Sequence, residues 1–182
     1  MDVAKVFSQR LNRERGFLDI PGAIEDLKRL NRPEVVLDEA LGHAARSLRP
    51  WRIFLLQTMR ELAARGEMDE HFLWRLWEHA VASLEVFGEE EIEKTLVALS
   101  HSTPGCNVLV HRVVPALFTF YNNGDPRADW SWWVVWAAGL LGERNVKLPK
   151  ESAGALAELI DSHLDEERMR DARPILEFHL AE

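Results

Sequence analysis

Apolar residues recur with the 3.6-residue period of an α-helix along almost the whole chain. Alternating runs of the kind that form strands are nearly absent, so the pattern predicts an all-α fold of about ten helices with short connections. Aspartates and prolines mark the expected starts, and glycines or asparagines the expected ends. The expected helices cover 2–11, 21–31, 33–48, 51–64, 69–87, 89–100, 108–121, 125–141, 149–164 and 165–180, the last broken at Pro174.

Two of these segments are apolar on nearly every face. Residues 108–121 contain only His111 and Arg112 as residues that can carry a charge near neutral pH, and 130–141 contain none. A helix that is hydrophobic all round is normally buried. We therefore expect these two helices to form a central hairpin in which Trp136 and Leu140 are inaccessible, with the amphipathic helices packed in antiparallel pairs outside it.

No flexible linker or low-complexity tract divides the chain, so we expect one helical domain over residues 1–182. The segment from His101 to Asn107 contains Pro104 and Gly105, and it is expected to be a loop. It is also the candidate seam between two halves of the domain.

Charge and composition exclude several classes of protein. Apolar residues make up 47% of the chain and charged residues 29%, which is typical of a globular domain. The net charge is -8, and it divides into 12 basic against 9 acidic residues over 1–66 and 10 against 21 over 67–182. An acidic chain of this kind disfavours nucleic acid as a partner.

The chain shows no feature of a membrane or secreted protein. The apolar stretch 130–141 is too short for the roughly 20 residues that span a bilayer, and no secretory leader pattern appears. Cys106 is the only cysteine, so no intrachain disulfide can form and a reducing, cytoplasmic location is expected.

Two short windows resemble the helix starts of HEAT-type repeats. One is Arg32-Pro-Glu-Val-Val-Leu-Asp-Glu-Ala-Leu-Gly-His-Ala-Ala45, and the other joins Gly124-Asp-Pro126 to Val135-Trp-Ala-Ala-Gly-Leu-Leu-Gly-Glu143. In that family, a turn with Asp-Pro precedes a helix with small residues and Leu-Gly near its end. The resemblance implies an α-solenoid that binds other macromolecules along one face, and it implies no catalytic residues.

Cys106 is a candidate reactive thiol. It lies before an expected helix, whose dipole lowers a thiol pKa, and His101 and His111 are near in sequence. The alternative is a small residue in a capping turn. Since His111 is about 140° around the helix from Cys106, it is poorly placed to act as its base.

The histidines do not form a metal-ligand pattern. His71, Glu78 and His79 share one expected helix, and Glu39 and His43 share another, but no complete ligand set can be written. We expect solvated histidines, no metal and no cofactor.

The chain contains seven tryptophans, which favour either an aromatic cage for a cation or core packing. Core packing is the preferred interpretation for most of them, and Trp74 is expected at the edge of its apolar stripe. The seven are Trp51, Trp74, Trp77, Trp130, Trp132, Trp133 and Trp136.

Arginines supply the one candidate partner site. Arg46, Arg49 and Arg52 surround a corner expected at Pro50, with Arg60 two turns beyond. They could bind a carboxylate, a phosphate or an acidic protein surface, or they could simply be charges at a helix C-terminus. The acidic runs Glu89–Glu91 and Asp165–Glu167 are interpreted as charges that stabilise helix N-termini.

These features predict a non-enzymatic helical scaffold or adaptor that binds another protein. One alternative is a helical bundle with a small-molecule or cofactor pocket near Trp130–Trp136 and 101–107, which could be an enzyme. A further alternative is a chaperone-like or immunity-type protein that shields its partner. The sequence specifies neither the partner nor the oligomeric state.

Overall fold

The computed structural model describes residues 49–163 and 167–181, together with Leu11, Asn12, Phe17, Leu18, Gly22 and Asp26. For Leu11, Asn12, Phe17 and Leu18, and for residues 49–52, 54, 55 and 168, it describes the backbone alone. Most of the first three expected helices, the HEAT-like window over 32–45 and residues 164–166 therefore lie outside the described residues, whereas Glu167 of the second acidic run is the first residue of a short helix. Gly22 and Asp26 are helical, as expected for the segment that follows Pro21.

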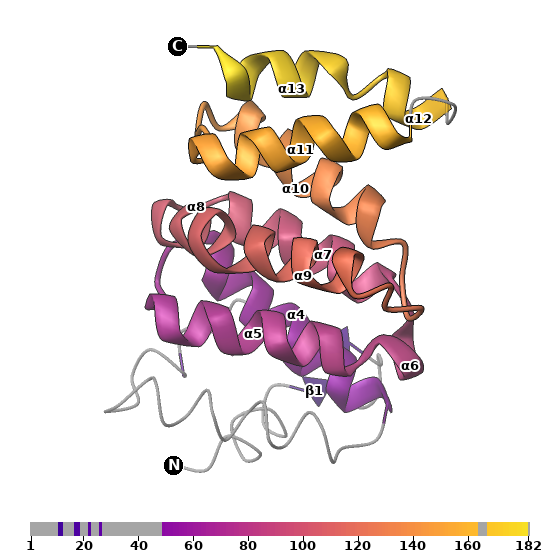
Figure 1. The fold of residues 1–182 in the computed structure, drawn as a ribbon. Helices are drawn as coiled ribbons and strands as arrows, with labels where there is room; N and C mark the ends of the chain where they lie inside the picture. The colour runs from indigo at the N-terminus through magenta and orange to yellow at the C-terminus, as the bar shows by residue number, and fades with distance from the viewer. Residues whose placement is uncertain are drawn as a thin grey trace.

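The described chain is all-α, as the hydrophobic period predicted. Its helices stack side by side, with α4 and α5 towards one end of the described part and α11 and α13 towards the other (Figure 1). The elements are α4 (Arg49–Ala64), α5 (Glu70–Ala82), α6 (Leu84–Phe87), α7 (Glu90–Ser100), α8 (Thr103–Val108), the π-helical turn η1 (Leu109–Val113), α9 (Val114–Asn122), α10 (Trp130–Glu143), α11 (Lys150–Ser162), α12 (Glu167–Arg170) and α13 (Arg173–Leu180).

One small departure from helix lies near the N-terminus. Leu11–Asn12 (β1) pairs antiparallel with Phe17–Leu18 (β2), where the sequence predicted Leu11 on a helix face. Leu11 is opposite Leu18 and Asn12 is opposite Phe17. Strand residues next to a short connection can satisfy each other's backbone groups locally, which the helical period did not reveal.

Helix ends follow the capping residues in most places. The side chain of Asp69 accepts the N–H of Phe72 at 2.8 Å, which fixes the start of α5. Gly66 and Gly88 both have φ of 71°, and they end α4 and α6 in the left-handed region that glycine adopts at little cost. Pro149 precedes α11, and the last helical segment breaks before Pro174.

Residues 101–107 are not the expected loop. The hydroxyl of Ser102 accepts the N–H of Gly105 at 3.2 Å, and the chain is helical from Thr103 onward. Gly105 approaches α7 so closely that a Cβ there would lie 2.0 Å from the carbonyl oxygen of Leu99. Glycine is therefore needed here so that the backbone can approach α7 closely. The sequence pattern had indicated a loop instead.

The helix expected from Asp125 begins only at Trp130. Asp125 accepts hydrogen bonds from the backbone and guanidinium of Arg127, with 2.7 Å between Nη2 and Oδ2, and these contacts hold the pKa of Asp125 at about 2. Such Asp-centred turns compete with helix. Asp129 then caps α10 by accepting the N–H of Trp132 at 3.3 Å.

Pro115 explains the π-helical turn between α8 and α9. A proline has no N–H and its ring collides with the carbonyl four residues earlier in a regular helix. The wider turn over Leu109–Val113 directly precedes it, and Val114 donates to the carbonyl of Leu109 five residues back. The helix continues through this turn without a break.

The core is built on α7 and on the hairpin of α9 and α10. α7 packs against α4, α5, α8 and α10, and its side chains Ile92, Leu96 and Leu99 are completely buried. α9 and α10 pack against each other along their length, as the two apolar segments predicted. The buried positions of α10 include Trp133, Val134, Ala137, Ala138 and Leu141.

The hairpin is not buried on every side, and here the prediction was wrong. Trp136 and Leu140 are half-buried rather than inaccessible, because they occupy the face of α10 that α7 and α9 leave uncovered. The two helices therefore carry more apolar surface than the described neighbours cover.

His179 fastens the last helix to the core. The buried ring accepts the N–H of Leu148 at Nδ1 (3.1 Å), and its Nε2 donates to the carbonyl of Ala138 (2.9 Å). The bond from Leu148 needs the neutral imidazole, because a protonated Nδ1 cannot accept a hydrogen bond. Burial lowers the pKa of His179, and Lys147 lowers it further, while the Ala138 carbonyl opposes them. None of the described helices is long and apolar enough to cross a membrane.

Gly105→Ala should lower the free energy of unfolding by about 2–4 kcal/mol, because the new Cβ collides with the backbone of Leu99. Gly154→Ala in α11 is the matched control. No atom lies within 4 Å of a Cβ there, so helix propensity alone should raise stability by about 0.5–1 kcal/mol. Urea denaturation measures the unfolding free energy of both variants. A Gly105→Ala variant as stable as the wild type would contradict the close approach of Gly105 to Leu99.

His179 should make stability depend on pH. Because its folded pKa lies below the unfolded value, its contribution is fully present above pH about 6.5 and is lost as the pH falls through the folded pKa. We expect the unfolding free energy to decrease between about pH 7.5 and 5.5 in the wild type and more weakly in His179→Gln. The control is His71→Gln, at an exposed position, which should keep the wild-type slope. Equal slopes in all three proteins would exclude this role for His179.

Candidate binding surfaces

The acidic run Glu89–Glu91 at the start of α7 makes contacts with other helices and also places negative charge at a helix N-terminus. Glu91 is buried and accepts a hydrogen bond from Arg60 of α4 at 2.5 Å, with side chains only 9% and 11% exposed. Glu89 accepts the indole N–H of Trp133 on α10. The interpretation of these glutamates as helix-end charges alone was therefore wrong, since tertiary contacts use two of them. Glu90 remains exposed and pairs with Lys94.

The predicted arginine site changes in the structure. Arg46 lies outside the described residues, and only the backbone of Arg49 and Arg52 is described, in the first turn of α4. Pro50 lies inside that turn. Arg60 forms an ion pair with Glu91, so its guanidinium contributes to the contact between α4 and α7. An acidic partner for Arg46, Arg49 and Arg52 stays a prediction.

Cys106 lies inside α8 and is buried, with its thiol 3.4 Å from the carbonyl oxygen of Ser100. Burial raises the pKa of the thiol, although Arg144 partly opposes this. A raised pKa disfavours the thiolate that a nucleophile requires. These surroundings favour Cys106 as a packed core residue.

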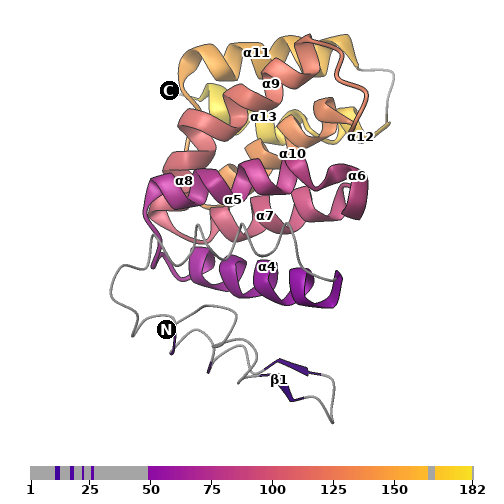
Figure 2. The ribbon, with the colours of Figure 1, turned by 90° about the horizontal axis from the view of Figure 1, so that it is seen from below.

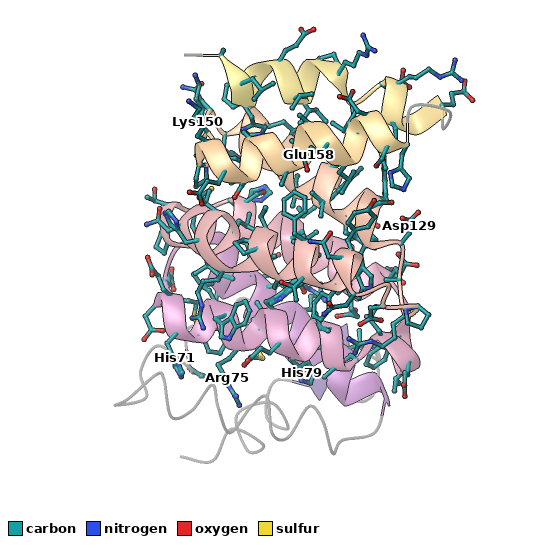
Figure 3. The ribbon with its side chains drawn as sticks, in the orientation of Figure 1. His71, Arg75, His79, Asp129, Lys150 and Glu158 are labelled. Carbon is teal, nitrogen blue, oxygen red and sulfur yellow. The ribbon has the colours of Figure 1, made fainter. Side chains whose placement is uncertain are left out.

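The histidines of α5 lie along its outer side, where His71, Arg75 and His79 follow one another at four-residue intervals (Figure 3). Glu78 is 3.5 Å from Arg75, an exposed ion pair on the same helix. Within the described part of the chain, no group of three His, Cys, Asp or Glu residues could hold a metal ion.

The tryptophans divide into a buried group and a half-buried group. Trp77, Trp130 and Trp133 belong to the core, as expected. Trp74 is half-buried beneath the guanidinium of Arg112, which lies 4.2 Å from the ring centroid. Trp132 and Trp136 are half-buried on the same face of α10, with ring centroids 5.8 Å apart.

A groove of about 530 Å³ lies between α9 and α11. One helical face of α9 forms one wall, through Pro115, Phe118, Tyr121 and Asn122. The opposite wall is a face of α11 that carries two acidic side chains, three small ones and one leucine. It consists of Glu151, Ser152, Ala155, Glu158, Leu159 and Ser162.

The groove is apolar on one side and negatively charged on the other. Glu151 and Glu158 are exposed and seven residues apart, so they share one side of α11. Glu158 lies on the side of α11 that faces α9 (Figure 3). Near the Ser162 end of the groove, the ring of Tyr121 lies 5.7 Å from the ring of His163. Along α11 it extends about 16 Å at the helical rise per residue.

A smaller cleft of about 200 Å³ lies on the other exposed face of the hairpin, between α10 and the segment leading into α13. Trp132, Trp136 and Leu140 form its α10 side and Ile175 its α13 side. Glu143 and Asp171 add two exposed carboxylates to the lining. Residues 101–107, which were expected beside a pocket at Trp130–Trp136, line neither cavity.

Comparison with known proteins finds no match: no family model, no curated protein and no solved structure is similar to this chain.

Removing one partner of the Arg60–Glu91 ion pair should destabilise the protein strongly, whereas replacing both partners with apolar residues should destabilise it little. Arg60→Met leaves the Glu91 carboxylate without its partner in a nearly dry site, and we expect a loss of about 3 kcal/mol in unfolding free energy. Arg60→Met/Glu91→Leu should recover most of this loss. The control is Lys94→Met in the exposed pair with Glu90, which should leave the denaturation midpoint unchanged. A double variant as unstable as the single one would contradict this account.

Proposed function

We propose that the protein is a non-enzymatic helical scaffold that binds another protein through the groove between α9 and α11. The observation that supports this most strongly is the uncovered apolar surface of the hairpin. α9 contains no charged residue, yet Pro115 is exposed and Phe118 and Tyr121 are half-buried along the groove. Apolar faces left open on a folded domain commonly mark interaction sites.

The shape of the groove favours a helical segment of the partner. Its two walls are faces of neighbouring helices, and small side chains at Ser152 and Ala155 leave space between them. An amphipathic helix binds such a groove by inserting apolar side chains spaced three or four residues apart. The stacked arrangement of the helices supports a solenoid-like architecture, in which concave faces bind extended partners.

The charge of the groove favours a basic partner. Glu151 and Glu158 line one wall, and no basic side chain among the described residues lines the groove. Lysine or arginine beside the apolar anchors of a partner would therefore approach two carboxylates. A chaperone-like protein that shields its partner would use the same groove and the same kind of partner, and it would differ only in the biological consequence of binding.

The test is the binding of two synthetic helical peptides that differ only in charge. Both carry leucine at helical spacing, and they carry either lysine or glutamate at the flanking positions. We expect the lysine peptide to bind at least ten-fold more tightly, with an affinity that falls as salt is added. Equal affinities for the two peptides would contradict the proposal.

Variants locate the interaction. Glu151→Lys/Glu158→Lys should weaken the lysine peptide at least ten-fold, whereas Glu61→Lys/Glu177→Lys, with the same net charge at exposed positions outside the groove, should not. Ala155→Gln narrows the groove without changing charge, and Ala157→Gln, outside it on the same helix, is its control. If the affinity of the lysine peptide is unchanged in both groove variants, the peptide binds outside the groove.

A further inference from the structure

The cleft between α10 and α13 combines two features that both select positive charge. Trp132 and Trp136 present indole rings, which are the most favourable aromatic surface for a cation. Glu143 and Asp171 bring carboxylates from two different elements to the same cavity. Indoles and carboxylates attract the same ligand, because the face of an aromatic ring is itself electronegative.

The cleft runs along one side of α10. Trp132, Trp136, Leu140 and Glu143 are spaced by four, four and three residues, so they follow one side of the helix. From Trp132 to Glu143 this side extends about 16 Å. Asp171 and Ile175 face it from the segment that leads into α13 and from α13 itself.

Gly139 contributes to the shape of the cleft. It lies in the middle of α10, where glycine destabilises a helix by roughly 0.5–1 kcal/mol relative to alanine. A Cβ at this position would lie 3.2 Å from Cδ1 of Ile175. The missing side chain therefore allows α13 to approach α10 and leaves an apolar floor between Trp136 and Leu140.

Basic residues close in sequence do not occupy the cleft. Arg144, Arg170 and Arg173 adjoin Glu143 and Asp171 along the chain, but none of them is among the residues that line the cavity. The lining is thus apolar and acidic, on a surface separate from the groove of α9 and α11.

We propose that this cleft is a binding site for an alkylammonium group. The apolar chain of the ligand lies against Trp136, Leu140 and Ile175, and its ammonium group is attracted by the indole faces and by Glu143 and Asp171. The source is either a free small amine or the side chain of a lysine in another protein, since both present the same chemistry. The volume of about 200 Å³ suits a ligand of this size and no larger cofactor.

The first experiment compares hexylammonium with 1-hexanol and hexanoate, which share its chain but differ in charge. Binding is followed by ¹⁹F NMR of the 5-fluorotryptophan protein, with the signals of Trp132 and Trp136 assigned by Trp→Phe variants. We expect saturable shifts at these two signals, a dissociation constant on the order of 1 mM for hexylammonium, and at least five-fold weaker binding of hexanol and hexanoate.

Charge variants separate a cation site from an apolar crevice. Glu143→Gln/Asp171→Asn should reduce the preference for hexylammonium over hexanol to less than two-fold. Asp161→Asn/Glu177→Gln removes the same charge at exposed positions outside the cleft and should preserve the preference. Circular dichroism checks that all variants remain folded.

A second pair of ligands distinguishes the two sources. Nα-acetyl-lysine N-methylamide with a free side-chain amine is compared with its Nε-acetylated form. Binding of the free form at least as tightly as hexylammonium assigns a lysine side chain, and weaker binding assigns a small amine. Equal binding of hexylammonium and hexanol, or shifts that do not saturate at Trp132 and Trp136, would overturn the proposal.

Discussion

The structure depends on the burial of one apolar hairpin that is larger than its neighbours can cover. α9 carries no charged side chain and α10 carries only Glu143. Burying any face of this pair away from water therefore lowers the free energy of the folded protein. α7 and α13 each cover part of α10, and the remaining faces of the pair border the groove and the cleft. The same property that builds the core also leaves two apolar surfaces, which is why both proposals lie on this hairpin. Among the described helices, Figure 2 shows α11 next to α9 towards one side of the molecule, and α7 and α4 towards the opposite side.

Buried polar contacts then fix how the layers pack. The Arg60–Glu91 pair joins α4 to α7, Trp133 and Glu89 join α10 to the start of α7, and His179 joins α13 to α10. Hydrophobic burial is non-directional, whereas each of these contacts has one acceptable geometry. They give the stack a defined register while the open sides of the hairpin remain available.

Helical periodicity and capping residues were sufficient to predict the fold class, the glycine ends of α4 and α6, and the pairing of α9 with α10. They failed where a local contact outweighed the pattern. Gly105 indicated a loop because its close approach to Leu99 is a tertiary property. Glu89 and Glu91 were interpreted as helix-end charges because their partners are 44 and 31 residues away in sequence. The expected full burial of Trp136 and Leu140 failed for the same reason, since an all-round apolar helix does not reveal how many neighbours it will have. Trp132 and Trp136 were noted in the sequence, but nothing there placed Asp171 beside them.

The central claim is that the hairpin exposes selected apolar faces in the free protein. Solvent paramagnetic relaxation of ¹⁹F signals, measured with a soluble gadolinium chelate on protein labelled with fluorinated tryptophan and phenylalanine, tests this residue by residue. We predict strong relaxation at Trp132, Trp136 and Phe118, and weak relaxation at Trp77 and Trp133, which are 1% and 6% exposed. Equal protection of all five side chains would mean that the groove and the cleft are already covered, and it would contradict the account.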